Sequence, residues 1–261
     1  MHLFYTPEID GATGSTYLLS EEESKHGVRV LRLVKGDTVY LTDGKGTLWR
    51  AAVAQAADRA CLLQIEERFD DWGARSYYVH LAVAPTKNSD RYEWMVEKCT
   101  EVGVDEITPL IAARSERKVY KTDRIQRIAV SAMKQSLKAR LPLIHPAISL
   151  EAFMDRPFDG IKLMAHCGGG ARISLQEALS ASPSHRMLIL IGPEGDFSPE
   201  EVSLAEAKGF QSIHLGASRL RTETAALTAA IGAYLFGNVE YHNCPTPNVN
   251  RFFLAFVPTP E

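Results

Sequence analysis

Apolar and polar residues alternate with a period of two in the first part of the chain. The segment TVYLTDGKGTLWRAAVAQ (38–55) alternates on both sides of a DGKG turn at residues 43–46, a pattern that is typical of a β-hairpin. The segment CLLQIEERF (61–69) predicts a further strand. Several short strands joined by turns favour a small β-barrel or sandwich.

After residue 76 the pattern changes to continuous apolar runs that alternate with segments of helical periodicity. The runs that predict buried strands are YYVHLAVAP (77–85), EITPLIA (106–112), DGIKLMAHC (159–167), HRMLILIG (185–192) and QSIHLG (211–216). The segments that predict the longer helices are 89–104, 122–139, 198–210 and 222–237. Strands that alternate with helices favour an α/β domain with a mostly parallel sheet.

The change of pattern divides the chain into two domains and a tail. We expect a β-rich domain at residues 1–72, an α/β domain at residues 73–240 and an irregular, proline-containing tail at residues 241–261. The composition, 45% hydrophobic and 23% charged, is that of a soluble globular protein. No apolar run approaches the roughly 18 residues of a membrane span, and the N-terminal sequence does not read as a signal peptide. We therefore expect a cytoplasmic protein without membrane contact.

The cysteines are scattered along the sequence. They are Cys61, Cys99, Cys167 and Cys244. The sequence has no CxxC motif and no Cys/His pairing at the spacing of a zinc site. We expect reduced thiols that mostly act as small buried hydrophobic residues, and we expect no bound metal.

Basic residues are concentrated in one segment, although the whole chain has a net charge of −3. Residues 114–140 hold nine Lys/Arg against two Asp/Glu, a net charge of +7. A local basic patch of this kind is typical of a surface that binds a polyanion. The alternative is an ordinary solvated helix flank, and charge alone does not decide between the two.

The segment LILIGPEGDFSPEEV (188–202) passes from a buried strand almost directly into a helix. Ser198 is a good N-cap, Pro199 suits the first helical position, and Glu201 completes a capping box. Gly192 and Gly195 allow a ligand to approach the backbone closely. Open α/β sheets bind ligands at the carboxyl ends of their strands. The alternative is a tight turn without a ligand.

Three successive strands end in glycine-containing loops. These are HCGGG (166–170), IGPEGD (191–196) and LGASRLRTET (215–224), and loops that converge would form one pocket. The GxxxxGK[ST] and GxGxxG motifs of phosphate and dinucleotide sites are absent from the sequence. Glu194 also disfavours a phosphate, so we expect a neutral or cationic ligand.

Several spaced motifs resemble the RsmE family, the 16S ribosomal RNA uridine N3-methyltransferases. IGPEGDFSPEEV and LGASRLRTETAAL are similar to the two C-terminal signatures of that family. HGVRVLRLVKGD is similar to its N-terminal motif, and EKCTEVGVDEITPL and RSER to its central motifs. The resemblance extends over roughly residues 1–240 with the motifs in the same order.

The resemblance implies a fold, a cofactor and partners. It implies a PUA-like β-barrel that binds RNA, followed by a SPOUT-type α/β methyltransferase domain with a trefoil knot. It also implies S-adenosyl-L-methionine as the cofactor, 16S rRNA of the small ribosomal subunit as the substrate, and a homodimer. The expected cofactor-binding residues are His166, Ile191, Gly192, Pro193, Glu194, Gly195, Leu215, Gly216, Leu220, Thr222 and Ala225.

Methyl transfer to uracil N3 requires removal of a proton and stabilisation of charge on the uracil oxygens. Arg221 is the candidate for charge stabilisation, with a structural ion pair to Glu194 or Glu223 as the alternative. Glu223 is the candidate proton acceptor, with a role at the start of its helix as the alternative. The candidate RNA-binding residues are Lys25, His26, Arg29, Arg32, Arg114, Arg117, Lys118, Gln135, Ser136 and Lys138.

The sequence departs from the family pattern at two places. Asp196 stands where the family usually has a second glycine. The segment Lys134-Gln135-Ser136-Leu137-Lys138 stands where the family usually has Glu-Gln-Ser-Gly-Arg. The rival interpretation of the whole chain is a non-catalytic RNA-binding factor for ribosome assembly. The intact GPEG and LRTET loops favour an enzyme.

Overall fold

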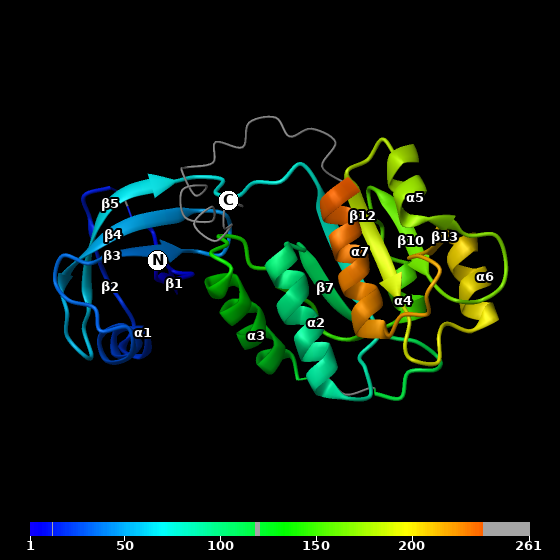
Figure 1. Cartoon of the computed structure of the whole chain (residues 1–261), viewed down its shortest axis with the longest axis horizontal. Coiled ribbons are helices and arrows are strands. Elements are labelled where there is room, and N and C mark those ends of the chain that lie inside the picture. The colour runs from blue at the N-terminus through cyan, green and yellow to red at the C-terminus, as the bar shows by residue number, and fades with distance from the viewer. Residues whose placement is uncertain (12, 118–120, 237–261) are drawn as a thin grey trace, which may run out of the picture.

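A five-stranded sheet forms the N-terminal part of the computed structural model, which describes residues 1–11, 13–117 and 121–236 (Figure 1). Its strand order is β1-β3-β4-β5-β2. The strands are β1 (Leu3–Tyr5), β2 (Thr16–Leu18), β3 (Thr38–Thr42), β4 (Leu48–Gln55) and β5 (Leu62–Phe69). The predicted hairpin is confirmed, because β3 and β4 pair antiparallel across residues 43–47. Alternate residues of these strands, among them Val39, Leu41 and Leu63, are fully buried in the barrel core.

A short helical segment lies at one end of this barrel (Figure 1). Helix α1 (Glu21–Lys25) begins at Ser20, whose side chain accepts a hydrogen bond from the Glu23 amide. A turn of π-helix, η1 (His26–Val30), follows directly. The HGVRVLRLVKGD motif therefore lies on an exposed turn of the barrel and not in a strand.

The second sheet contains parallel strands in the order β11-β13-β10-β12-β6-β7-β8, with β9 also paired to β7. Every pairing in it is parallel among the described residues. The predicted mostly parallel α/β domain is therefore confirmed. The strands are β6 (Tyr78–Val83), β7 (Glu106–Ile111), β8 (Leu143–Ile144), β9 (Ile148–Ser149), β10 (Ile161–Ala165), β11 (Ile173–Ser174), β12 (Arg186–Ile191) and β13 (Gln211–His214).

Helices cover both faces of the parallel sheet (Figure 1). One face packs on α2 (Ser89–Val102), α3 (Thr122–Gln135), α5 (Leu175–Ala181) and α7 (Thr222–Phe236). The other face packs on α4 (Leu150–Met154) and α6 (Pro199–Ala207). The central strands β6 and β12 are buried on both faces, which explains their continuous apolar sequence. No helix in the described part of the chain is long and apolar enough to cross a membrane.

Helix α3 ends earlier than the periodicity predicts. The expected helix ran to residue 139, whereas the last helical residue is Gln135. The reason is Leu137, which has a left-handed backbone with φ of +56°. A left-handed residue terminates a helix and is usually glycine. Leu137 stands at the position where the RsmE motif has its glycine, and its side chain packs into the small apolar cluster between the barrel and the segment after α3.

The segment that follows α3 joins the barrel to the α/β domain. The Ala139 carbonyl accepts hydrogen bonds from the Gly46 amide at 2.8 Å and from the Thr42 hydroxyl at 3.2 Å. The Leu141 amide donates to the Gly44 carbonyl at 2.8 Å. We call this contact the domain junction. The residues expected to form the C-terminal tail, 241–261, lie outside the part of the chain that the structure describes.

Candidate active site

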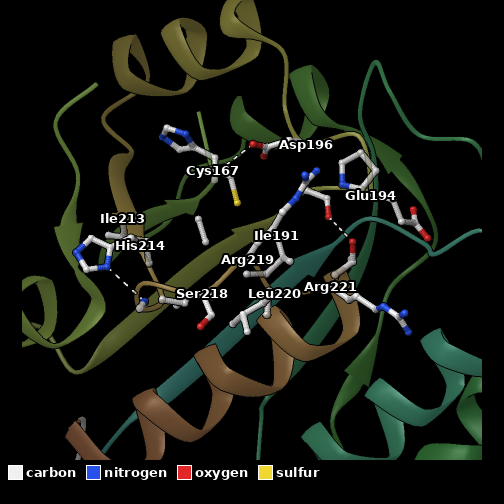
Figure 2. A pocket seen from close by; sticks show the side chains of 18 of the residues that line it. Cys167, Ile191, Glu194, Asp196, Ile213, His214, Ser218, Arg219, Leu220 and Arg221 are labelled. Atoms are coloured by element: carbon white, nitrogen blue, oxygen red, sulfur yellow. Dashed lines mark hydrogen bonds between the residues drawn. The ribbon is translucent and has the colours of Figure 1, made fainter. Parts of the chain in front are cut away.

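A cavity of about 350 Å³ lies at the carboxyl ends of β10, β12 and β13 (Figure 2). Its walls come from the three loops that follow these strands and from the first turn of α7. A cavity of this size accommodates a small organic molecule. The lining residues are Ala165, His166, Cys167, Arg172, Ile191, Gly192, Pro193, Glu194, Asp196, Ile213, His214, Leu215, Gly216, Ser218, Arg219, Leu220, Arg221, Thr222 and Ala225.

The loop after β12 is a tight turn followed by a firmly capped helix. The Asp196 amide donates to the Pro193 carbonyl at 2.9 Å, which closes the turn. Ser198 and Glu201 form the predicted capping box at the start of α6. The Glu201 carboxylate also accepts a hydrogen bond at 2.7 Å from the Ala113 amide in the loop after β7. This helix start therefore anchors two loops.

Asp196 explains how this chain accommodates the missing family glycine. Its φ is +62°, a left-handed conformation that aspartate adopts more readily than most residues. Its carboxylate accepts hydrogen bonds of 2.9 Å from the Phe197 amide and from the Cys167 amide. The second of these bonds connects the loop after β12 to the loop after β10 across the cavity wall. A glycine at this position would lack that connection.

Two residues outside the cavity hold the same loop from behind. Arg114 donates from Nη1 to the Gly195 carbonyl at 2.9 Å. The Glu194 carboxylate accepts a hydrogen bond of 2.9 Å from the Lys87 amide. Glu194 therefore does not form the ion pair with Arg221 that was considered as an alternative. It fixes the loop to the segment after β6.

A buried hydroxyl group links the loop after β13 to the loop after β12 by a hydrogen bond. Thr222 donates from Oγ1 to the Gly192 carbonyl at 3.0 Å, and this bond is buried. Gly216, just after β13, has φ of +119° and no neighbouring atom within 4 Å of the position of a Cβ. Its backbone therefore faces open space at the cavity, where a ligand can approach it closely.

His166 contributes polar atoms without protein partners. Its side chain is 7% exposed, and neither ring nitrogen has a hydrogen-bond partner among the described residues. Burial lowers the pKa of His166 below its ordinary value, so the imidazole is neutral at pH 7. Arg172 donates to the His166 carbonyl at 2.6 Å and fixes the strand end. Buried polar atoms without partners are expected to bind a ligand or water.

The two candidate catalytic residues occupy different environments. Arg221 is exposed at the rim of the cavity and has no side-chain hydrogen bond or ion pair with the residues that the structure describes (Figure 2). Glu223 is 8% exposed and does not line the cavity. One of its oxygens lies 3.8 Å from Arg91 Nε, and the other is buried without a partner. The ion pair between Arg221 and Glu223, the alternative to a role in charge stabilisation, is therefore not formed.

The structure brings the expected cofactor-binding residues together, with one exception. All of them line the cavity except Gly195, whose carbonyl is held by Arg114. Sequence reasoning missed several lining residues because their signal was only their position at a strand end or within a loop. These are Ala165, Cys167, Arg172, Asp196, Ile213, His214, Ser218 and Arg219.

The expected RNA-binding residues do not form one free surface. Lys25, His26, Arg29 and Arg32 are exposed on the barrel, and Arg29 pairs with Asp58 at 2.6 Å. Lys118 lies outside the described residues. Arg114 supports the cavity loop, as described above, and Arg117 donates to the Lys87 carbonyl at 3.3 Å.

The basic segment after α3 serves the domain junction more than an RNA surface. Burial lowers the pKa of Lys138. Ser136 donates to the Ala132 carbonyl at 2.7 Å, which satisfies the end of α3. Lys134 pairs with Glu23 of the barrel at 2.6 Å, and Arg140 pairs with Asp71 at 2.9 Å. Gln135 remains exposed. Much of the basic excess therefore balances acidic groups within the chain.

Comparison with known proteins identifies the family. Residues 74–233 match the model of an RNA methyltransferase domain, and residues 19–66 match that of an RNA methyltransferase PUA domain. A ribosomal RNA small subunit methyltransferase E from Synechocystis is 31% identical over 219 residues, which are 82% of this chain and 71% of the relative. The chain belongs to the ribosomal RNA small subunit methyltransferase E family.

Solved structures of this methyltransferase family have the same architecture. A probable rRNA-methyltransferase from Porphyromonas gingivalis is 39% identical, with a TM-score of 0.81 over 91% of this chain and 98% of that chain. A ribosomal RNA small subunit methyltransferase E from Neisseria gonorrhoeae is 29% identical, with a TM-score of 0.79 over 88% of this chain and 95% of that chain. The latter structure is bound to S-adenosyl methionine. The expected PUA-like barrel and methyltransferase domain are therefore confirmed.

Proposed function

We propose that this chain transfers the methyl group of S-adenosyl-L-methionine to N3 of a uridine in 16S rRNA of the small ribosomal subunit. The observation that carries the proposal is the cavity formed by the three strand-end loops in a member of this methyltransferase family. A ribosomal substrate places the reaction in the cytoplasm.

The cavity residues fit the cofactor. Backbone groups of the three loops, together with the unpartnered nitrogens of His166, offer hydrogen bonds to an adenosyl group. Ile191, Leu215 and Leu220 offer apolar walls. The cofactor supplies an electrophilic methyl group on a sulfonium, and the Asp196 carboxylate at the cavity complements its positive charge.

The side chains of this chain then have to position the uracil and accept its proton. Arg221 stands free at the rim, where its guanidinium can stabilise negative charge that develops on the uracil oxygens. Glu223 stays the predicted proton acceptor. Because it does not line the cavity, it would act through a water molecule, and its support is the buried carboxylate oxygen without a protein partner.

A methyl-transfer assay tests this function directly. The chain is incubated with cofactor labelled in its methyl group and with small subunits or 16S rRNA from a strain that lacks this activity. We expect one labelled uridine per rRNA, identified as N3-methyluridine by mass mapping. No label in any RNA, together with no thermal shift on addition of S-adenosylhomocysteine, would instead support the rival, a non-catalytic RNA-binding assembly factor whose pocket has lost the cofactor.

We assign RNA binding to the exposed turn of the barrel that contains Lys25 and Arg32, which we call the barrel turn, and not to the domain junction. Lys25 and Arg32 are exposed, and neither forms an ion pair with the described residues. We expect the double variant Lys25→Ala/Arg32→Ala to weaken RNA binding at least tenfold and to lower the slope of log K against log salt by about two, one for each lost phosphate contact. Fluorescence anisotropy at several salt concentrations measures both quantities.

The control for the RNA prediction removes the same charge elsewhere. Arg68 and Lys208 are exposed and pair with Asp70 and Asp155. The double variant Arg68→Ala/Lys208→Ala is expected to keep its RNA affinity within about threefold. Equal weakening by both double variants would mean that overall charge, and not the barrel turn, determines binding.

A homodimer is also part of the proposal, and its support is an apolar face of α7. Ile231, Tyr234 and Leu235 are 40%, 42% and 54% exposed, and residues spaced by three and four lie on the same side of a helix. Exposed apolar patches of this kind mark protein interfaces. We propose that a second copy of the chain covers this face of α7, since α7 also borders the cavity.

Leu235→Asp is expected to convert the dimer into a monomer, because it buries a charge in the interface. Light scattering after size exclusion should then report the 28.9 kDa mass of one chain instead of twice that mass. Val30→Asp is the matched control, since Val30 is 66% exposed on the barrel. A dimer that survives Leu235→Asp would show that α7 is not the interface.

The trefoil knot stays a prediction from the family. Its support is that the last described helix, α7, returns to β6 and α2 in the first half of the domain while it also contacts β12. Ordinary folds avoid such threading. An experimental density map in which residues 217–221 pass outside the loop after β12 would contradict it.

A further inference from the structure

Three side chains with metal-binding atoms meet on the parallel sheet away from the cavity. They are His80 on β6, Glu106 on β7, and His145 between β8 and β9. His80 and Glu106 are direct neighbours in the parallel register. Both lie toward the amino ends of their strands, whereas the cavity lies at the carboxyl ends. We call these three residues the His-Glu-His cluster.

The distances within the cluster are close to those of a coordination sphere. His80 Nδ1 lies 3.4 Å from Glu106 Oε2, and His145 Nε2 lies 2.5 Å from the same oxygen. All three ligand atoms lie within 4.8 Å of one another. Bonds of about 2.0–2.2 Å to a tetrahedral ion place neighbouring ligand atoms roughly 3.4 Å apart. The His80 distance matches this value, and the His145 distance requires a small rotation of the carboxylate.

Outer residues orient two of the three ligands. His80 Nε2 lies 2.7 Å from Thr108 Oγ1 in a buried hydrogen bond, which leaves Nδ1 facing the cluster. The Tyr78 hydroxyl donates to Glu106 Oε1, the carboxylate oxygen that faces away from the histidines. Metal-binding histidines and carboxylates usually have such second partners. In addition, the Phe153 ring packs edge-on against His80 at 5.4 Å.

The cluster is only partly exposed to solvent. The side chain of His80 is 10% exposed, that of Glu106 is 24% exposed and that of His145 is 22% exposed. This arrangement provides an entry path and room for a water molecule as a fourth ligand. The cation of Arg156, which lies over the Phe153 ring at 5.9 Å, disfavours a bound cation, and the Glu106 carboxylate offsets it.

We propose that the His-Glu-His cluster binds one divalent transition-metal ion, for which Zn²⁺ is the best match. Two imidazole nitrogens and one carboxylate oxygen are ligands that Zn²⁺ prefers over Mg²⁺ or Ca²⁺. The ion would fasten the chain between β8 and β9 to the sheet edge, where the His145 amide already donates to the Ile107 carbonyl at 3.0 Å. Its role is structural, because the cluster is separate from the cavity.

Short-spacing motifs could not reveal this site. The sequence analysis expected no metal because no Cys/His pair has zinc-finger spacing, whereas these ligands are separated by 26 and 39 residues in the sequence. The strand pairing brings His80 and Glu106 together. The alternative is a cluster held only by the hydrogen bonds described above, and the experiment below separates the two.

Zinc titration of the metal-free full chain tests the proposal. We expect one Zn²⁺ per chain by calorimetry, with a dissociation constant of micromolar or tighter, and a higher melting temperature with Zn²⁺ than with a chelator. Co²⁺ should give the visible d–d absorption of a four-coordinate nitrogen and oxygen site. His145→Gln is expected to weaken Zn²⁺ binding at least tenfold and to remove the Co²⁺ spectrum.

Matched controls make each outcome decisive. His185→Gln changes an exposed histidine at the start of β12 and should leave Zn²⁺ affinity within twofold. Cys167→Ser removes the exposed thiol and should also leave Zn²⁺ affinity within twofold. If His145→Gln does not fold, Glu106→Gln, which preserves side-chain shape, replaces it as the cluster variant in the same measurements. The proposal is overturned if the chain binds no Zn²⁺, if the cluster variants bind it as tightly as the parent, or if Cys167→Ser removes the binding.

Discussion

Arg221→Ala is expected to reduce methyl transfer at least a hundredfold while the chain keeps its affinity for S-adenosylhomocysteine within about threefold. The reason is the position of the Arg221 side chain. Arg221 stands at the cavity rim without a protein partner among the described residues, so its charge is available to the uracil and is not used to hold the loops. A loss of this size, about 2.7 kcal/mol, is typical of removing one group that stabilises charge in a transition state.

Single-turnover kinetics and calorimetry measure the two quantities separately. Arg59→Ala provides the control, because Arg59 is an arginine on the barrel whose side chain is 84% exposed. That variant should keep the parent rate. Arg221→Lys should restore part of the lost rate by returning a positive charge. If Arg221→Ala retains turnover within tenfold of the parent, the guanidinium does not act in the chemical step.

Thr222→Val is expected to weaken cofactor binding about tenfold and to lower the free energy of unfolding by about 1–2 kcal/mol. The Thr222 hydroxyl is the buried donor to the Gly192 carbonyl. Valine has nearly the same shape but no donor, so the carbonyl loses its hydrogen bond in a buried place. The loop after β12 then loses its tie to the start of α7, and both segments line the cavity.

Thr228→Val is the matched control on the same helix. The Thr228 hydroxyl donates to the Thr224 carbonyl one turn earlier, at 2.8 Å on an exposed side. Its loss should change stability by less than about 0.5 kcal/mol, as for most surface substitutions, and should not change cofactor affinity. Equal weakening of cofactor binding in the two variants would show that the Thr222 bond does not shape the cavity.

The strand-end loops were the most predictable part of the site. Two-sided burial of RMLILI in β12, with Ser198 and Pro199 just beyond it, indicated the strand, the turn and the helix start almost to the residue. The sequence of a single strand does not indicate which strands lie beside it in a parallel sheet. The neighbours β10 and β12 are separated in the sequence by β11, α5 and loops, so only the tertiary structure shows that their ends meet.

The side chains that support the site were not predictable, because each acts over a long sequence distance. Asp196 connects to Cys167 across 29 residues, Arg114 to Gly195 across 81, and Glu194 to Lys87 across 107. Arg114 had been assigned to RNA from its charge and its motif. The structure shows that its guanidinium bonds to the cavity loop, so an arginine in a basic segment need not face the nucleic acid.

The domain junction fastens the barrel to the α/β domain. Its carbonyl at Ala139 is held by two barrel groups, and its ion pairs through Lys134 and Arg140 brace the two sides. These contacts set the distance between the cavity and the barrel turn, where we propose that RNA binds. We therefore expect the enzyme to select a uridine that lies at this distance from the RNA segment bound by the barrel, even if nothing at the cavity reads the neighbouring bases.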